Sequence, residues 1–126
     1  MDGSDLTIIA TGYMVHKALE AAKLLKNEDI SARVVNIHTI KPIDTELLIK
    51  CARETRAIVT VEEHSIYGGL GASVAEVIVR NYPVPMEIVG IQNVFCESGD
   101  YEQLLNKYGL SEENITAKYK LVLSRK

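Results

Sequence analysis

The sequence predicts an α/β fold in which a mostly parallel sheet is covered by helices on both faces. Short apolar runs, typical of strands that are buried on both sides, recur along the chain. Segments with apolar residues at helical spacing separate these runs, so strands and helices alternate. A chain of 126 residues is of ordinary size for one domain. We therefore expect a single domain over residues 1–126.

Four apolar runs are the predicted strands. They are residues 6–11 (LTIIAT), 31–36 (SARVVN), 57–62 (AIVTVE) and 86–91 (MEIVGI). Their continuous apolar character is that of strands inside a parallel sheet. Parallel neighbours need a crossover connection, and the helical segments between the runs supply it.

Two of the predicted helices lie between the first three strands. The first follows Gly12, and its apolar spacing leaves Lys17, Glu20 and Lys23 on the opposite face, where we expect solvent. The second starts at Asp44 or Thr45, either of which is a sound N-cap, and runs through residue 54.

Three more helices complete the predicted order. The third spans residues 72–81, and Ala72, Ala75 and Val79 are the positions expected to pack closely on the sheet. A short fourth helix covers residues 100–108, and a last helix ends the chain.

Composition excludes several classes of function. The net charge of −3 argues against a nucleic-acid partner, since phosphate binding needs clustered Lys and Arg. The opening residues MDGSD do not resemble a signal peptide, and no apolar run approaches the ~18 residues of a membrane span. Cys51 and Cys96 belong to no CxxC motif, and Cys51 falls on an apolar helix face. We expect a cytoplasmic protein with reduced thiols.

The segment AIVTVEEHSIYGGLG, residues 57–71, is the candidate functional edge. A strand runs into Glu62-Glu63-His64 and then into a glycine turn that opens a helix. In open α/β sheets, ligands or partners meet the domain at the carboxyl ends of the strands. The glycine pattern is G-x-G-x-x-V and follows the third strand, whereas a dinucleotide fingerprint follows the first. This difference favours a tight turn and close helix packing over phosphate binding.

The acidic pair before the turn does not form a paired-carboxylate site. Adjacent strand residues point to opposite faces of a sheet, so the Glu62 and Glu63 carboxylates cannot meet unless the strand bends. His64 can titrate near neutral pH, but no activated Ser or Cys nucleophile accompanies it. An interface role for His64 is favoured over proton transfer.

The remaining histidines and acids do not complete a cofactor or metal site. His38 lies in the loop that leaves the second strand, at the same edge, and His16 lies on an exposed helix face. The three histidines do not have the spacing of metal ligands. Gly99-Asp100 begins like the magnesium motif of thiamine-diphosphate enzymes, but Tyr101 replaces the second glycine and no Asn-Asn pair follows.

Four blocks of sequence, in this order, resemble the C-terminal domain of transketolase. They are TIIATG at 7–12, VNIHTIKPID at 35–44, VEEH with GGLG at 61–71, and GI with FCESG at 90–99. The resemblance covers residues 6–122. Related domains occur in deoxyxylulose-phosphate synthase and in the beta subunit of 2-oxoacid dehydrogenases. The histidine of VEEH and the F-x-E-S-G block favour transketolase.

This resemblance implies three layers, α/β/α, around a five-stranded mixed sheet with one antiparallel strand. Residues 91–95 or 39–40 are the expected source of the fifth strand. In the family, thiamine diphosphate and magnesium bind between two other domains, at a dimer interface. The resemblance therefore assigns no catalytic, cofactor-binding or metal-binding residue to this chain.

The function implied is that of a C-terminal domain or subunit of transketolase. The complete enzyme moves a two-carbon ketol unit between sugar phosphates, as in the pentose phosphate pathway, and the cofactor supplies the carbanion chemistry. The chain is expected to be inactive alone and to contact the cofactor-binding domains in a homo- or hetero-oligomer. The candidate contact residues are Glu62, Glu63, His64, Tyr67, Gly68, Gly69, Gly71 and His38. The alternative from another class is a free-standing nucleotide- or anion-binding module that uses the glycine turn.

Overall fold

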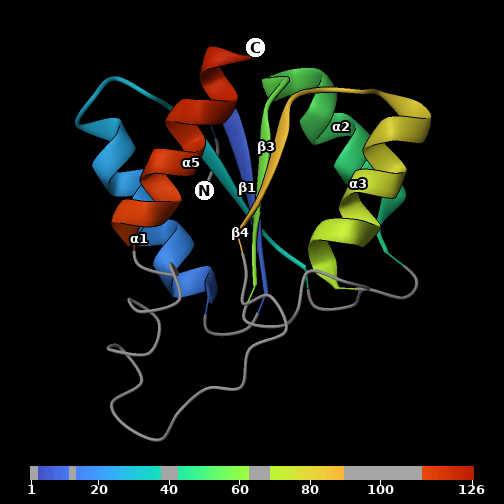
Figure 1. The fold of residues 1–126 in the computed structure, drawn as a ribbon, viewed down its shortest axis with the longest axis horizontal. Helices are drawn as coiled ribbons and strands as arrows, with labels where there is room; N and C mark the ends of the chain where they lie inside the picture. Colours follow the sequence, from blue (N-terminus) through green and yellow to red (C-terminus); the bar gives the residue numbers. More distant parts are fainter. Residues whose placement is uncertain (1–2, 12–13, 38–42, 63–68, 90–111) are drawn as a thin grey trace, which may run out of the picture.

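A parallel sheet forms the middle layer of the molecule (Figure 1). The computed structural model describes residues 3–11, 14–37, 43–62, 69–89 and 112–126. The strand order is β2-β1-β3-β4, and all three neighbouring pairs are parallel. The strands are β1 (Leu6–Ala10), β2 (Ala32–Asn36), β3 (Ile58–Val61) and β4 (Met86–Val89).

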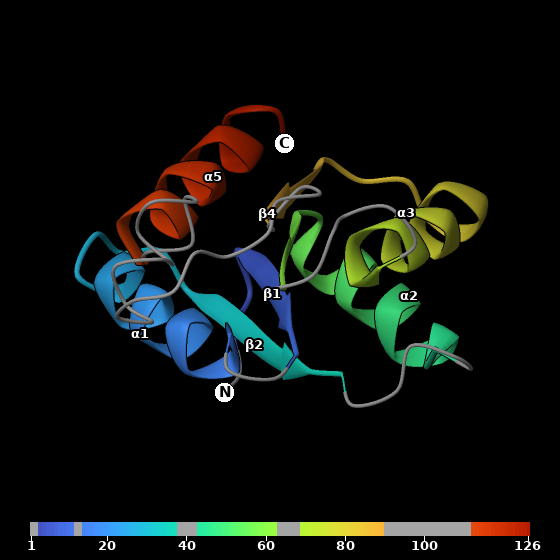
Figure 2. The ribbon, with the colours of Figure 1, turned by 60° about the horizontal axis from the view of Figure 1, so that its bottom comes forward.

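Helices cover both faces of this sheet, which confirms the predicted three layers (Figures 1 and 2). One face carries α1 (Met14–Lys26) and α5 (Glu112–Ser124), which lie side by side. The other face carries α2 (Thr45–Thr55) and α3 (Leu70–Asn81). Within the described residues, no helix is long and apolar enough to cross a membrane.

The described sheet has four strands rather than the five that the family resemblance implied. The two segments expected to supply the antiparallel strand, 39–40 and 91–95, lie outside the described residues. The short helix predicted over 100–108 also lies outside them.

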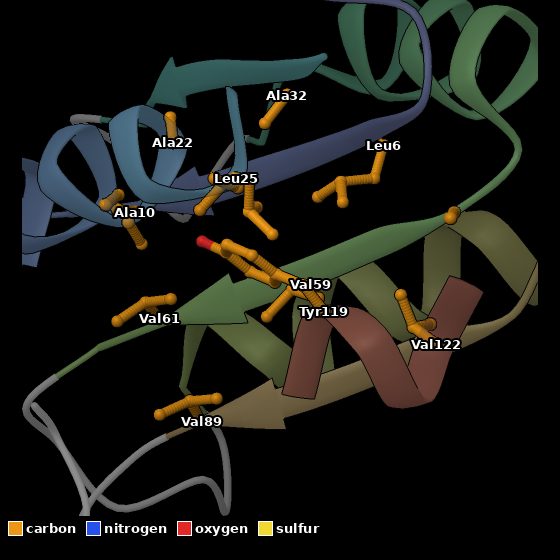
Figure 3. Close-up of a cluster of buried hydrophobic side chains, with 14 residues drawn as sticks. Leu6, Ala10, Ala22, Leu25, Ala32, Val59, Val61, Val89, Tyr119 and Val122 are labelled. Atoms are coloured by element: carbon orange, nitrogen blue, oxygen red, sulfur yellow. The ribbon is translucent and has the colours of Figure 1, made fainter. Parts of the chain in front are cut away.

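The core is divided by the sheet into two apolar clusters, because successive strand residues point to opposite faces. Toward α1 and α5, Leu6 and Ile8 of β1 and Val59 of β3 pack with Tyr119 and Val122 (Figure 3). The other cluster, toward α2 and α3, contains Ile9, Ile58, Leu48, Leu70, Val74 and Ile78.

Two predictions about helix faces were wrong. Lys17 is only 4% exposed, although the apolar spacing placed it on the solvent side. α1 packs against both the sheet and α5, so its buried arc is wider than that of a helix with one neighbour. In α3 the face toward the sheet is formed by Gly71, Val74 and Ile78, whereas Val79 is 70% exposed.

The ends of α2 follow the sequence signals closely. The Asp44 side chain accepts a hydrogen bond from the Leu47 N–H at 3.1 Å, as an N-cap does. At the other end, Arg56 adopts the left-handed conformation, with φ of 58°, and its N–H donates to the Ala52 carbonyl. This fixes the turn by which the chain enters β3.

The last helix is attached to the rest of the domain by ion pairs. The Glu87 carboxylate of β4 forms one ion pair with Lys118, at 3.4 Å, and another with Arg125. Lys120 pairs with Glu28, which follows α1, at 2.8 Å. Lys126 Nζ donates to the Asp5 carbonyl at 2.7 Å. α5 and the two residues that follow it are thereby joined to β4, to the turn after α1 and to the residue before β1.

Two buried hydroxyl groups differ in how they are satisfied. Thr55 Oγ1 lies 2.7 Å from Thr7 Oγ1 and 2.8 Å from the Cys51 carbonyl oxygen. The Tyr119 hydroxyl points toward α1 (Figure 3) and, among the described residues, has no hydrogen-bond partner. Burial raises the pKa of the Tyr119 phenol well above its usual value.

Tyr119→Phe should therefore stabilise the fold by about 1 kcal/mol, because it removes a buried hydroxyl that has no hydrogen-bond partner among the described residues. Thr55→Val, the matched control, should destabilise it by about 1–3 kcal/mol, because that hydroxyl is bonded. Urea unfolding of both variants measures the difference. A loss of stability in Tyr119→Phe equal to that in Thr55→Val would contradict this account.

The same tyrosine predicts a loss of stability at alkaline pH. A raised pKa in the folded state means that the unfolded chain releases the phenol proton first. Ionisation of Tyr119 therefore costs no stability below pH about 10, and the free energy of unfolding declines as the pH rises further. Unfolding free energies measured between pH 8 and pH 11 should fall less steeply for Tyr119→Phe than for the unmodified chain.

Candidate functional site

Glu62 joins the end of β3 to the beginning of α3. It directly follows β3, is fully buried, and its N–H donates to the Val89 carbonyl of β4 at 3.0 Å. Its Oε2 accepts a hydrogen bond from the N–H of Leu70, the first residue of α3, at 2.5 Å. The carboxylate therefore links two elements across the carboxyl edge, by which we mean the edge where the strands end.

This hydrogen bond bears on the idea that the glycine turn binds an external anion. The first N–H groups of a helix are natural anion donors, and the helix dipole favours negative charge there. At α3 the Leu70 N–H is already paired with a carboxylate from the same chain. An incoming phosphate would compete for that donor and meet a buried carboxyl group beside it, which disfavours the nucleotide-binding alternative.

Gly71 is explained by close packing against β4. A Cβ added to this residue would lie 2.7 Å from Cγ2 of Ile88, closer than real carbon contacts allow. Gly69 is the N-cap of α3 and has extended backbone, with φ of −95° and ψ of −160°, so its conformation does not demand glycine. Of these two glycines, Gly71 sets how near α3 comes to the sheet.

The structure brings together Glu62, Gly69 and Gly71 of the predicted contact residues. Glu63, His64, Tyr67 and Gly68 lie in 63–68, and His38 lies in 38–42, both outside the described residues. Their proposed roles stay predictions.

His16 occupies the exposed position predicted for it. Its side chain is 63% exposed and lies 2.9 Å from Glu20 on the same helix. The described residues contain no group of three His, Cys, Asp or Glu side chains able to hold a metal ion.

Sequence reasoning missed a polar cluster between β2 and α2. Arg33 Nη1 lies 2.6 Å from Glu54 Oε1 and 3.9 Å from Sγ of the buried Cys51. The hydrogen bond from Arg33 lowers the pKa of the Glu54 carboxyl. Nothing in the local pattern signals this pair, because the two residues are 21 positions apart.

A groove lies at the opposite, amino edge of the sheet, where the strands begin. Its volume is about 680 Å³. It is lined by the residues between α3 and β4, by the C-cap of α2 and by the last residue: Asn81, Tyr82, Pro83, Val84, Pro85, Arg56 and Lys126. It is separate from the Glu62 edge.

Comparison with known proteins places this fold in one family. The family described as "Transketolase, C-terminal domain" matches residues 1–115. A putative transketolase C-terminal section from Methanocaldococcus jannaschii is 50% identical over 116 residues, covering 91% of this chain and 36% of that protein. A 6-deoxy-6-sulfo-D-fructose transketolase subunit from Clostridium sp. strain MSTE9 is 43% identical over 99% of this chain and 39% of its own length.

A solved structure that is similar to this chain points to the same family as the sequence relatives. It is titled a split gene transketolase, inactive beta4 tetramer, and matches with a TM-score of 0.94 and 50% identity over 99% of this chain and 41% of that one. A 1-deoxy-D-xylulose-5-phosphate synthase from Heliobacterium modesticaldum is also 45% identical, over 90% of this chain but 18% of that protein. This chain thus spans well under half the length of these relatives.

Gly71→Ala should destabilise the domain by about 1–3 kcal/mol, the usual cost of an extra carbon in a packed contact. In an Ile88→Ala background the same change should cost much less, because the clashing side chain is gone. Thermal unfolding of the four proteins of this cycle measures the coupling between the two positions. Equal costs in both backgrounds would mean that Ile88 is not what requires a glycine here.

Proposed function

The chain belongs to the transketolase C-terminal domain family, and we propose from this that it serves as the C-terminal domain of a ketol-transferring enzyme. The complete enzyme would move a two-carbon unit from a ketose phosphate to an aldose phosphate, and this chain would be inactive alone. The observation that carries the proposal is the match to transketolase subunits across almost the whole chain, in sequence and in structure. We further propose that the complete enzyme works in the cytoplasm, as part of the pentose phosphate pathway.

The described residues do not fit a site for magnesium and thiamine diphosphate. They hold no cluster of metal-ligating side chains, and the Leu70 N–H at the start of α3 is taken by Glu62. We propose that the rest of the enzyme binds the cofactor. Bound there, the cofactor would supply the carbanion stabilisation that ketol transfer requires.

The proposed role of this chain's own residues is to position a contact surface and to cover the neighbouring part of the enzyme. The carboxyl edge is built on β1 and β3, whose residues are all buried. It is held by Glu62, which bonds to β4 and to α3. A contact surface mounted on regular elements keeps its shape better than one on loops. The proposed partner at this edge is the cofactor-binding part of the enzyme.

Reconstitution tests this function. The purified chain should show no ketol transfer and no saturable heat on titration with thiamine diphosphate and magnesium. Mixed or co-expressed with the cofactor-binding part of the enzyme, it should restore formation of the ketol-transfer product. Turnover or saturable cofactor binding by the chain alone would refute the proposal. Formation of 1-deoxyxylulose 5-phosphate by the complex would favour the synthase named among the relatives.

A further inference from the structure

The groove at the amino edge has the size and the lining of a site for a small ligand. Its volume of about 680 Å³ lies within the roughly 300–1,000 Å³ that pockets for small molecules span. Residues 81–85, from the end of α3 to the start of β4, contribute the apolar lining, which includes the ring of Tyr82 and two prolines. Arg56 and Lys126 add the charged groups, and none of the lining side chains is acidic. In Figure 1 the segment after α3, the end of α2 and the C-terminus lie at the same end of the molecule.

The backbone that lines this groove is held by hydrogen bonds within the chain. The Arg56 N–H donates to the Ala52 carbonyl at the end of α2, and the Tyr82 N–H donates to the Ile78 carbonyl at the end of α3, both at 2.9 Å. The Pro85 carbonyl accepts a hydrogen bond from the first N–H of β3 at 3.1 Å. A site whose walls are already ordered loses little conformational entropy when a ligand binds.

These hydrogen bonds also determine which sign of charge prevails in the groove. Both α2 and α3 end here, and the free carbonyls at a helix end carry partial negative charge. The two helix-end carbonyls just named are satisfied from within the chain, and the Val77 carbonyl likewise accepts a hydrogen bond from Asn81 Nδ2 at 2.8 Å. The full positive charges of Arg56 and Lys126 therefore prevail, and they favour an anion.

Both cations have hydrogen-bonding capacity left for such an anion. Lys126 Nζ donates to the Asp5 carbonyl, which holds the ammonium in place and uses one of its three donors. Within the part of the chain that the structure describes, the Arg56 guanidinium has no hydrogen-bond or ion-pair partner. A guanidinium binds a phosphate group through two parallel N–H bonds, which makes phosphate the anion that this site fits best.

We propose that the amino-edge groove binds a small phosphorylated molecule with a flat ring, such as a nucleoside monophosphate. Arg56 and Lys126 hold the phosphate, and the ring stacks on Tyr82 beside the prolines. This site is not the glycine turn, where the Leu70 N–H is already paired with Glu62. The inference goes beyond the proposed function and does not depend on it, because none of the residues at the carboxyl edge takes part.

Calorimetric titration of the chain with three probes tests the ligand class. Adenosine monophosphate carries both the phosphate and the flat base, adenosine lacks the phosphate, and ribose 5-phosphate lacks the base. Adenosine monophosphate should bind at least about tenfold more tightly than either of the others. No saturable heat with adenosine monophosphate up to about 10 mM would overturn the inference. Equally tight binding of ribose 5-phosphate would overturn it as well, because the ring would then contribute nothing.

Nuclear magnetic resonance of the same titration locates the site. The amide signals of Arg56, Tyr82 and Val84 should shift as adenosine monophosphate is added. Shifts confined to Gly69 and Leu70 would place the ligand at the start of α3 and would refute a site in the groove.

Two variants with the same loss of charge separate a specific contact from general attraction. Arg56→Gln removes the unpaired guanidinium and should weaken binding of adenosine monophosphate by about tenfold. Arg53→Gln, the matched control, changes a residue in the last turn of the same helix that does not line the groove, and should bind within about twofold of the unmodified chain. Equal weakening by both folded variants would mean that only overall charge matters, and would overturn the inference. If Arg56→Gln does not fold, the resonance shifts of the unmodified chain decide.

A third variant tests the ring contact. Tyr82→Leu keeps apolar bulk but removes the aromatic face, so it should weaken binding of adenosine monophosphate by about fivefold or more and leave binding of ribose 5-phosphate unchanged. An unchanged affinity for adenosine monophosphate in the folded variant would contradict stacking on Tyr82.

Discussion

The burial of β1 and β3 on both faces is the constraint on which the rest of this domain depends. Every residue of these two strands is buried, so each face of the sheet must be covered by helices. This requirement brings α5, from the end of the chain, back beside α1, where Tyr119 and Val122 fill the space over the sheet. These apolar contacts determine where α5 lies, and the ion pairs at and after α5 add further contacts in that position.

Much of this architecture could be predicted from sequence, because the signals are local. The apolar runs gave the strands to within one or two residues in the described part of the chain, and Asp44 marked the start of α2. The alternation of strands and helices also predicted helices on both faces of the sheet, and the family resemblance agreed with it. The prediction of a fifth strand rests on segments outside the described residues.

The errors arose where two local patterns were equally good or where a distant element intervened. α3 is apolar nearly all round, so stripes one position apart both satisfy helical spacing, and only the fit of Gly71 against Ile88 selects one. Lys17 is buried on a helix that also contacts α5. The hydrogen bond between Glu62 and Leu70 joins residues eight positions apart, and local spacing does not predict its partner.

The contact between Lys126 and the Asp5 carbonyl has a consequence for how such a domain can be joined to others. Both residues lie at the amino edge, so the described ends of the polypeptide share one side of the domain, opposite the carboxyl edge. Cutting or fusing the backbone on that side leaves the other side's geometry unchanged, which is the arrangement that tolerates gene fission and domain fusion. The same fold can then belong to chains of different length, and it makes up 36% of one relative and 18% of another.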